Sequence, residues 1–186
     1  MQLSDFDFDL PPELIAQHPA AQRGASRLLA VPAGLPPQDR RFDELPELLA
    51  SGDLLVLNDT RVIRARLFGR KDSGGRVEAL IERVIGEHEA IAMLRASKPP
   101  RHGARIAWTG SSAEAVRSSA EVLGRAGEFW QLRFDEPVLR VLEREGLLPL
   151  PPYITHVPDA DDERRYQTVY AQAPGSVSAP TAGLHF

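Results

Sequence analysis

Short apolar runs separated by turn-forming residues are the main pattern of the first 63 residues. Arg27–Val31 and Asp53–Leu57 each place a continuous apolar run after one charged residue, which is typical of a buried strand. Phe42–Ala50 carries apolar residues at helical spacing, with Gly52 where a helix end belongs. Asp9–Gln17 begins with an acidic cap and with prolines that a first helical turn tolerates. The pattern predicts alternating strands and helices.

From residue 64 the pattern changes to short β-prone runs joined by glycine-containing links. The runs are Arg64–Arg70, Arg76–Val84, Glu89–Arg95, Arg105–Trp108, Glu121–Arg125 and Phe129–Phe134. Strands at this spacing predict a small antiparallel barrel or sandwich. The residues of Val77–Val84 would also suit a helix, but the preceding Gly74-Gly75 pair favours a hairpin.

The last third returns to helical and extended patterns. Pro137–Glu145 predicts a helix that ends at Gly146, and the proline-rich Leu147–Ile154 predicts an extended linker. Asp161–Tyr170 begins with acids, as a helix does. We therefore predict an α/β main domain formed by residues 1–63 and 136–186. A mostly antiparallel β-barrel domain, residues 64–135, is expected to be inserted in it, with its two ends close together.

Composition narrows the class of protein. The chain has 186 residues, 42% hydrophobic and 26% charged, with a net charge of −4. It contains no cysteine, which excludes disulfides, thiolate metal sites and a cysteine nucleophile. No metal-ligand spacing, signal peptide or apolar run of membrane-spanning length is present, so we expect a cytoplasmic protein without a metal or a membrane anchor.

One group of basic residues could contact phosphates. It comprises Arg61, Arg64, Arg66, Arg70, Lys71 and Arg76. Arginine suits bidentate phosphate contacts, although the same excess is expected from a GC-rich genome that uses arginine in place of lysine.

Polar residues follow the apolar run that ends at Leu57. In open α/β sheets ligands bind beyond the carboxyl ends of the strands, so Asn58, Thr60 and Arg61 are candidates for ligand binding. The alternative is a turn in which Asn58 and Asp59 satisfy local backbone groups. The arrangement also suggests the phosphate loop of phosphoribosyltransferases, but the glycine and second threonine of that loop are missing.

The segment Gly175–Phe186 is rich in small residues and contains a single histidine, His185. A glycine-containing turn with Thr181 and His185 beside it could hold an anionic or sugar-bearing ligand. A flexible tail is the alternative, but the apolar side chains of Leu184 and Phe186 argue against it.

Four segments together carry a family resemblance: Leu57–Ile63, Leu148–Ile154, Arg165–Ala171 and Gly175–Phe186. In this order they resemble the S-adenosylmethionine:tRNA ribosyltransferase-isomerase family of queuosine synthesis. The similarity runs from Leu3 to the last residue. Arg64 stands where proline is expected and Ser178 where alanine is expected, and the family continues well past the Leu-His-Phe block.

The resemblance implies an enzyme that acts on tRNA carrying 7-aminomethyl-7-deazaguanine at the wobble position. Such an enzyme transfers and isomerises the ribosyl moiety of S-adenosylmethionine, which is consumed, and gives epoxyqueuosine tRNA, adenine and methionine. It also implies an α/β fold with an inserted barrel and no metal. We expect a monomer, and we expect these 186 residues alone to be inactive.

The chemistry needs a base for the acidic proton next to the sulfonium, an acid for adenine departure and a neutral target amine. His185 is our candidate for proton transfer, assisted by Tyr166 or Glu163; alternatively His185 only hydrogen-bonds the ligand. The remaining candidates are substrate-binding: Asn58, Thr60, Arg61, Tyr153, Gln167, Thr181 and Gly183. The alternatives for the whole chain are a non-catalytic tRNA-binding fragment and a phosphoribosyltransferase-like enzyme.

Overall fold

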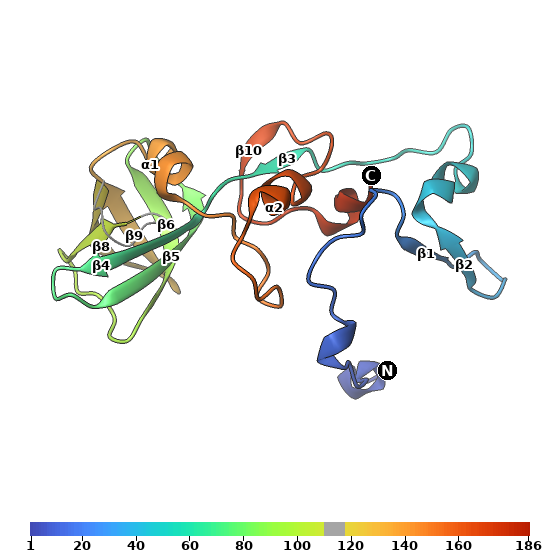
Figure 1. Cartoon of the computed structure of the whole chain (residues 1–186), viewed down its shortest axis with the longest axis horizontal. Helices are drawn as coiled ribbons and strands as arrows, with labels where there is room; N and C mark the ends of the chain where they lie inside the picture. The colour runs from blue at the N-terminus through green and yellow to red at the C-terminus, as the bar shows by residue number, and fades with distance from the viewer. Residues whose placement is uncertain (110–117) are drawn as a thin grey trace.

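A computed structural model describes residues 1–109 and 118–186. The chain is elongated: a barrel lies at one end, a small central unit follows, and a two-stranded hairpin lies at the other end (Figure 1). Outside the barrel the elements are η1 (Leu3–Phe6), η2 (Pro12–Leu14), β1 (Arg27–Ala30), β2 (Gln38–Arg41), η3 (Phe42–Leu48), β3 (Thr60–Val62), α1 (Val138–Glu145), α2 (Ala160–Arg165), β10 (Ala173–Ser176) and η4 (Thr181–His185). None of the helices in the described ranges is long and apolar enough to cross a membrane.

Six antiparallel strands close into the barrel. They are β4 (Arg66–Lys71), β5 (Arg76–Val84), β6 (Glu89–Ala96), β7 (Arg105–Trp108), β8 (Ser118–Ala126) and β9 (Phe129–Phe134). Their order is β4-β5-β6-β9-β8-β7, and β7 pairs with β4 to complete the closure. The predicted antiparallel barrel is confirmed, and the prediction of a hairpin rather than a helix over Val77–Val84 is confirmed with it.

The main hydrophobic core fills this barrel. Alternate residues of β5 point inward and are buried, as the period of two in a half-buried strand requires. The indole of Trp108 and the ring of Phe134 are fully or almost fully buried and stack with their centroids 6.0 Å apart. Helix α1 packs its apolar face, with Val138 and Val141 buried, against the same core.

A buried carboxylate joins α1 to the barrel. The side chain of Glu145 is 0% exposed and accepts a hydrogen bond of 2.8 Å from the Ser118 hydroxyl on β8. The guanidinium of Arg144 donates to its other oxygen at 2.7 Å. The buried charge is therefore both paired and hydrogen-bonded, which offsets the free-energy cost of taking it out of water.

The chain enters and leaves the barrel at one place. Arg66 and Leu147 exchange two backbone hydrogen bonds, of 3.1 Å and 2.8 Å. At the end of α1 a Cβ on Gly146 would lie 2.0 Å from the Arg64 carbonyl oxygen, so only glycine allows the two segments to pass this closely.

The expected α/β main domain is not confirmed. Apart from the barrel, the described residues form two two-stranded sheets, and the only parallel pairing among them joins β3 to β10. Asp53–Leu57, predicted as a buried strand, does not form a strand and is exposed, with Leu54 at 86%. A strand requires a hydrogen-bonded neighbour, and none of the described strands pairs with this segment.

Three further predictions need correction. The strand at Arg27 forms, but as β1 of an exposed hairpin in which Leu29 is 63% exposed, so it is not buried. The helix predicted over Phe42–Ala50 is the 3-10 helix η3, and it contains Pro46, which removes a helical hydrogen bond. The helix predicted over Asp9–Gln17 is reduced to the single turn of η2.

Candidate functional site

The segment that precedes Phe186 forms the short 3-10 helix η4, which lies between residues 1–26, which we call the N-terminal arm, and α2 (Figure 1). The Arg23 guanidinium ties these parts together: it donates to the Leu184 carbonyl at 3.3 Å and to the Arg165 carbonyl at 3.1 Å. Gly183 is buried, and a Cβ there would lie 2.5 Å from the Tyr170 hydroxyl oxygen. Glycine at this position therefore allows η4 to pack against the side chains of Tyr170 and Thr168.

The imidazole of His185 contacts Ser26 of the N-terminal arm and Phe42 of η3. Its Nδ1 atom lies 2.9 Å from the Ser26 hydroxyl oxygen, and its ring centroid lies 5.5 Å from that of Phe42. The Phe186 ring packs edge-on against the same Phe42 ring at 4.9 Å. The segment is packed, so its interpretation as a flexible tail is wrong.

A cavity of about 330 Å³ opens beside His185. Its lining is Ala16, Gln17, His18, Pro19, Leu150, Pro151, Tyr153, Ile154, Asp162, Arg165, Tyr166, Thr181, Leu184 and His185. Four of the candidate residues, His185, Tyr166, Tyr153 and Thr181, thus meet at one cavity although the sequence separates them. The small second core, which includes buried Leu148 and Leu150, supports its apolar side.

Burial raises the pKa of the Tyr166 phenol, and a backbone hydrogen bond from Ala179 opposes this effect. The phenol is therefore protonated at neutral pH and can donate a hydrogen bond or a proton, but it cannot serve as a base. Among the candidates at this cavity, His185 carries the imidazole, which is the side chain that most often serves as a general base.

Three other candidates lie at a second cavity, of about 410 Å³, between β3, α1 and α2. Arg61 and Gln167 line it, and so does Glu163, which forms an ion pair with Arg64. The Gln167 amide also exchanges two hydrogen bonds with the backbone of Val62, at 3.0 Å and 2.8 Å, and so fixes β3 against the end of α2. Glu163 is therefore not among the residues that line the cavity at His185.

The two remaining candidates after Leu57, Asn58 and Thr60, contact backbone groups. The Asn58 side-chain oxygen accepts a hydrogen bond of 3.0 Å from the Thr60 backbone, which is the turn that the sequence offered as an alternative. The Thr60 hydroxyl lies 3.5 Å from the Ala173 carbonyl oxygen, on the neighbouring strand β10.

Several residues of the first cavity were not among the sequence candidates. The Gln17 side chain joins the arm to the proline-rich linker through the Tyr153 carbonyl at 2.9 Å and the Thr155 amide at 2.9 Å. The imidazole of His18 stacks on that of His156, with centroids 4.7 Å apart, and His156 contacts Asp162 at 2.8 Å. Asp162 was visible as an acid of a helix start, whereas no local pattern marks Gln17 or His18.

Residues 3–186 match the sequence model of a family described as queuosine biosynthesis protein. The chain belongs to this family. It is 60% identical over 186 residues to a protein of Thiobacillus denitrificans named S-adenosylmethionine:tRNA ribosyltransferase-isomerase, covering 100% of this chain and 52% of that protein. A protein of Azoarcus sp. with the same name is 59% identical over 188 residues, with the same coverage.

A solved structure from Thermotoga maritima, titled S-adenosylmethionine tRNA ribosyltransferase, is 33% identical to the chain. The match covers 81% of this chain and 52% of the other, with a TM-score of 0.39. The chain thus spans about half the length of the curated relatives that it matches.

Proposed function

We propose that this chain is part of an enzyme of queuosine synthesis that transfers and isomerises the ribosyl moiety of S-adenosylmethionine. The acceptor is the amine of 7-aminomethyl-7-deazaguanine at the tRNA wobble position, and the products are epoxyqueuosine tRNA, adenine and methionine. The observation that carries the proposal is the meeting of His185, Tyr166, Tyr153 and Thr181 at one cavity of a chain that belongs to this family.

The composition of the cavity suits S-adenosylmethionine, which joins a flat purine to a sugar and a cationic sulfonium. Leu150, Ile154 and the Tyr153 ring offer an apolar wall for the purine, and Asp162 supplies the negative charge that a sulfonium prefers. The volume of about 330 Å³ falls at the lower end of the range of about 300–1,000 Å³ for small-molecule sites. S-adenosylmethionine is a consumed substrate here, and we assign no metal to the reaction.

Proton transfer is assigned to His185. With Nδ1 donating to the Ser26 hydroxyl oxygen, Nε2 keeps its lone pair and can take the acidic proton beside the sulfonium. The neutral phenol of Tyr166 is placed in the same cavity and can donate a hydrogen bond to departing adenine. Thr181 and Gly183 shape the loop that carries the imidazole.

The second cavity is assigned to substrate binding rather than to proton transfer. Arg61 suits a phosphate of the tRNA, with Gln167 beside it and Asn58 and Thr60 shaping the turn that precedes it. Glu163 is assigned an assisting role through its ion pair. We further propose that residues 64–135 form an inserted barrel domain, and that the enzyme works as a cytoplasmic monomer.

Release of adenine separates this function from its alternatives. S-adenosylmethionine is incubated with the Thiobacillus denitrificans relative, or with a chimera whose matching half is replaced by this chain, with and without tRNA that carries the modified base. We expect adenine release only when that tRNA is present. A tRNA-binding fragment would bind tRNA and release nothing, and a phosphoribosyltransferase would instead release pyrophosphate from phosphoribosyl pyrophosphate.

A further inference from the structure

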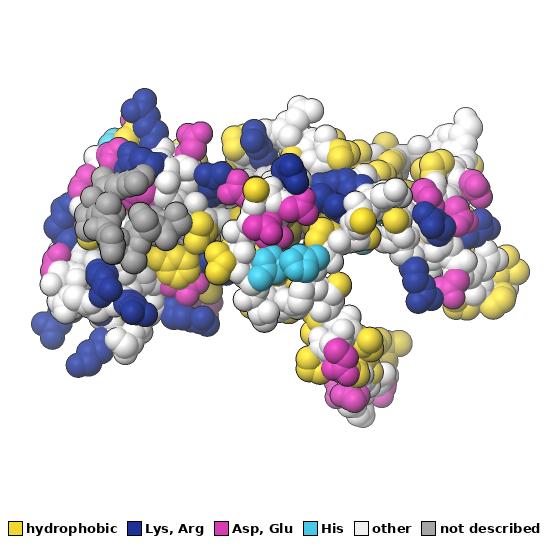
Figure 2. Space-filling view, viewed as in Figure 1, with side chains coloured by type: hydrophobic (Ala, Val, Ile, Leu, Met, Phe, Trp, Pro, Cys, Tyr) yellow, Lys and Arg dark blue, Asp and Glu magenta, His cyan; other side chains and the backbone are white. Residues whose placement is uncertain are grey.

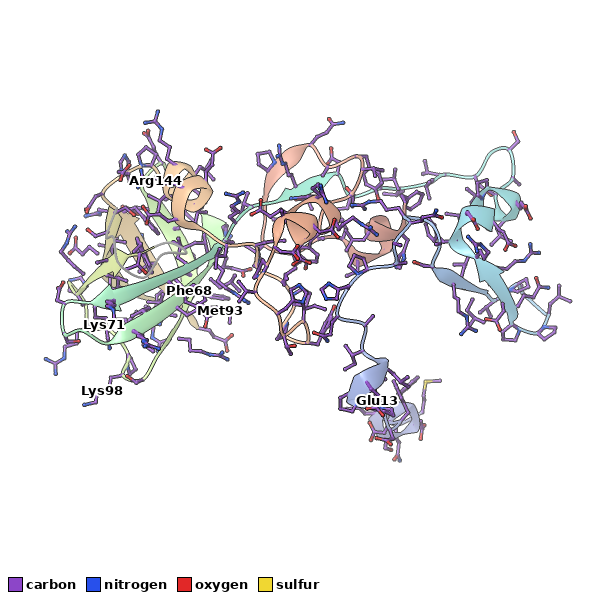
Figure 3. All side chains as sticks on the ribbon, in the orientation of Figure 1. Glu13, Phe68, Lys71, Met93, Lys98 and Arg144 are labelled. Atoms are coloured by element: carbon purple, nitrogen blue, oxygen red, sulfur yellow. The ribbon has the colours of Figure 1, made fainter. Side chains whose placement is uncertain are left out.

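The outer face of β4, β5 and β6 combines cations with exposed apolar side chains. Arg70 on β4 lies directly opposite Arg76 on β5. Arg95 on β6 lies opposite Glu78, which is two residues after Arg76 on the same face of β5. All three arginines are exposed. Phe68 on β4 and Met93 on β6 lie on the same face, 39% and 50% exposed, opposite Glu78 and Leu80 of the intervening strand β5; both are labelled in Figure 3. We call this surface the arginine face.

Within residues 1–109 and 118–186, no carboxylate forms an ion pair with the three arginines of the arginine face. Among the ion pairs of the described residues none involves Arg70, Arg76 or Arg95. Glu78, the nearest acid in the register, instead pairs with Arg66 at 3.4 Å. Like charges directly opposite one another destabilise a sheet, so this arrangement costs folding free energy that an anionic ligand would offset.

The face is also hollowed. A groove of about 570 Å³ runs over it, lined by the three arginines, Phe68 and Thr109 among others. Lys and Arg side chains follow the lower edge of the barrel beside a hydrophobic group (Figure 2). The chain as a whole is acidic, with a net charge of −4, so the concentration of cations here is local.

We propose that the arginine face binds a single-stranded segment of RNA, with the three guanidiniums on phosphates and Phe68 stacked on a base. Arginine suits bidentate phosphate contacts, and an exposed aromatic ring on a barrel strand stacks on bases of any sequence. A duplex would hide its bases from Phe68. The identification of this RNA as the loop of a tRNA rests on the proposed function, whereas the recognition of RNA does not.

The test measures binding and needs no catalysis. The affinity of the 186-residue chain for a fluorescein-labelled transcript of a tRNA anticodon stem and loop is measured by fluorescence anisotropy at several salt concentrations. The variant is Arg70→Gln/Arg76→Gln/Arg95→Gln. The control is Arg27→Gln/Arg41→Gln/Arg164→Gln, which removes the same charge from exposed arginines outside the barrel, each paired with a carboxylate.

We expect the arginine-face variant to bind the RNA at least about tenfold more weakly. The slope of its plot of log affinity against log salt concentration should be shallower by about 2, because each of the three lost phosphate contacts with a single strand contributes about 0.7. The control should stay within about threefold of the parent. Equal losses in the two variants would show that only total charge matters and would overturn the proposal, and so would undiminished binding by the arginine-face variant.

Phe68→Ala tests the stacking part separately. Loss of one base stack corresponds to roughly 5-fold to 140-fold weaker binding, with the salt dependence unchanged. Unchanged affinity, a preference for fully paired RNA, or equal displacement by polyglutamate would contradict the proposal. If the binding results are as expected but no adenine is released, RNA binding by the arginine face is supported and the proposed reaction is rejected. If adenine is released but the binding results are not as expected, only the proposal for the arginine face is rejected.

Discussion

The imidazole of His185 is hydrogen-bonded to Ser26, with Nδ1 and the hydroxyl oxygen 2.9 Å apart. The two residues are 159 positions apart in the chain, so the contact exists only because η4 packs against the N-terminal arm. The contact restrains the orientation of the ring, which leaves Nε2 without this partner. Ser26 is therefore a positioning residue for the proposed proton transfer.

Ser26→Ala should lower turnover without abolishing it. A misplacement of about 1 Å in a reacting group costs up to about 100-fold in rate, and loss of one hydrogen bond to the ring frees it to move. Turnover of the chimera described above is measured over a range of pH. Ser26→Thr keeps a hydroxyl and should recover most of the rate, and failure of this rescue would argue against the positioning role.

Gly183→Ala should destabilise the packing of η4. The added methyl would lie 2.5 Å from the Tyr170 hydroxyl oxygen and 2.7 Å from the Thr168 side chain, which must move apart. We expect a loss of about 1–3 kcal/mol in the free energy of unfolding, measured with urea. Gly86→Ala is the control, since a methyl there would have Glu89 as its nearest neighbour, at 3.9 Å. An equal loss of stability in this control would contradict the steric explanation for Gly183→Ala.

Two adjacent serines on β8 should differ in their contribution to stability. Ser118 donates to the buried carboxylate of Glu145, whereas Ser119 donates to the half-exposed Asp135. Ser118→Ala should cost about 1–3 kcal/mol in the free energy of unfolding, because it leaves a buried charge short of a partner. Ser119→Ala should cost about 0.5 kcal/mol or less. Equal losses would show that the Glu145 carboxylate does not depend on Ser118.

The start of α2 should lose stability in acid. Backbone N–H groups of Asp162 and Asp161 donate to the Asp159 carboxylate and lower its pKa. A lowered folded-state pKa gives stability that is present above the ordinary aspartate value of about 3.9 and is lost as the pH falls through the lower folded value. The difference in melting temperature between the parent and Asp159→Ala should therefore shrink below about pH 4.

The control for that experiment is Asp9→Ala, on the exposed N-terminal arm. It should change the melting temperature little at any pH in the range. A difference between the parent and Asp159→Ala that stayed constant from neutral pH into the acid range would contradict the assigned role of the carboxylate.

The barrel could be predicted from the sequence because the alternation of apolar and polar residues and the glycine turns are visible within each strand and its ends. Arg76–Val84 alternates buried and exposed positions, and Gly74-Gly75 marks the turn before it. The prediction of a buried strand at Asp53–Leu57 was wrong because the sequence of this segment does not show whether a neighbouring strand is present. An apolar run indicates that a segment suits a buried strand, but whether it becomes one depends on a neighbouring strand that the run does not encode.

The residues of the candidate site could be predicted only in part, because some of them are marked by a local pattern and others are not. The glycine-containing segment with His185 stands out locally, and the cavity unites it with Tyr166 and Tyr153. Gln17 reaches the cavity through contacts 136 to 138 positions away in the chain, which no local pattern reveals. The sequence also could not show that Glu163 pairs with Arg64 rather than lining the same cavity.

The kinetic effect of His185→Ala tests the central claim most directly. Adenine release by the chimera with modified tRNA is measured over a range of S-adenosylmethionine concentrations, before and after the substitution. If His185 moves a proton, kcat should fall by about 100-fold to 10,000-fold, with a small change in KM. An intact kcat with only a higher KM for S-adenosylmethionine would show that His185 binds the substrate and would contradict the assignment of proton transfer to it.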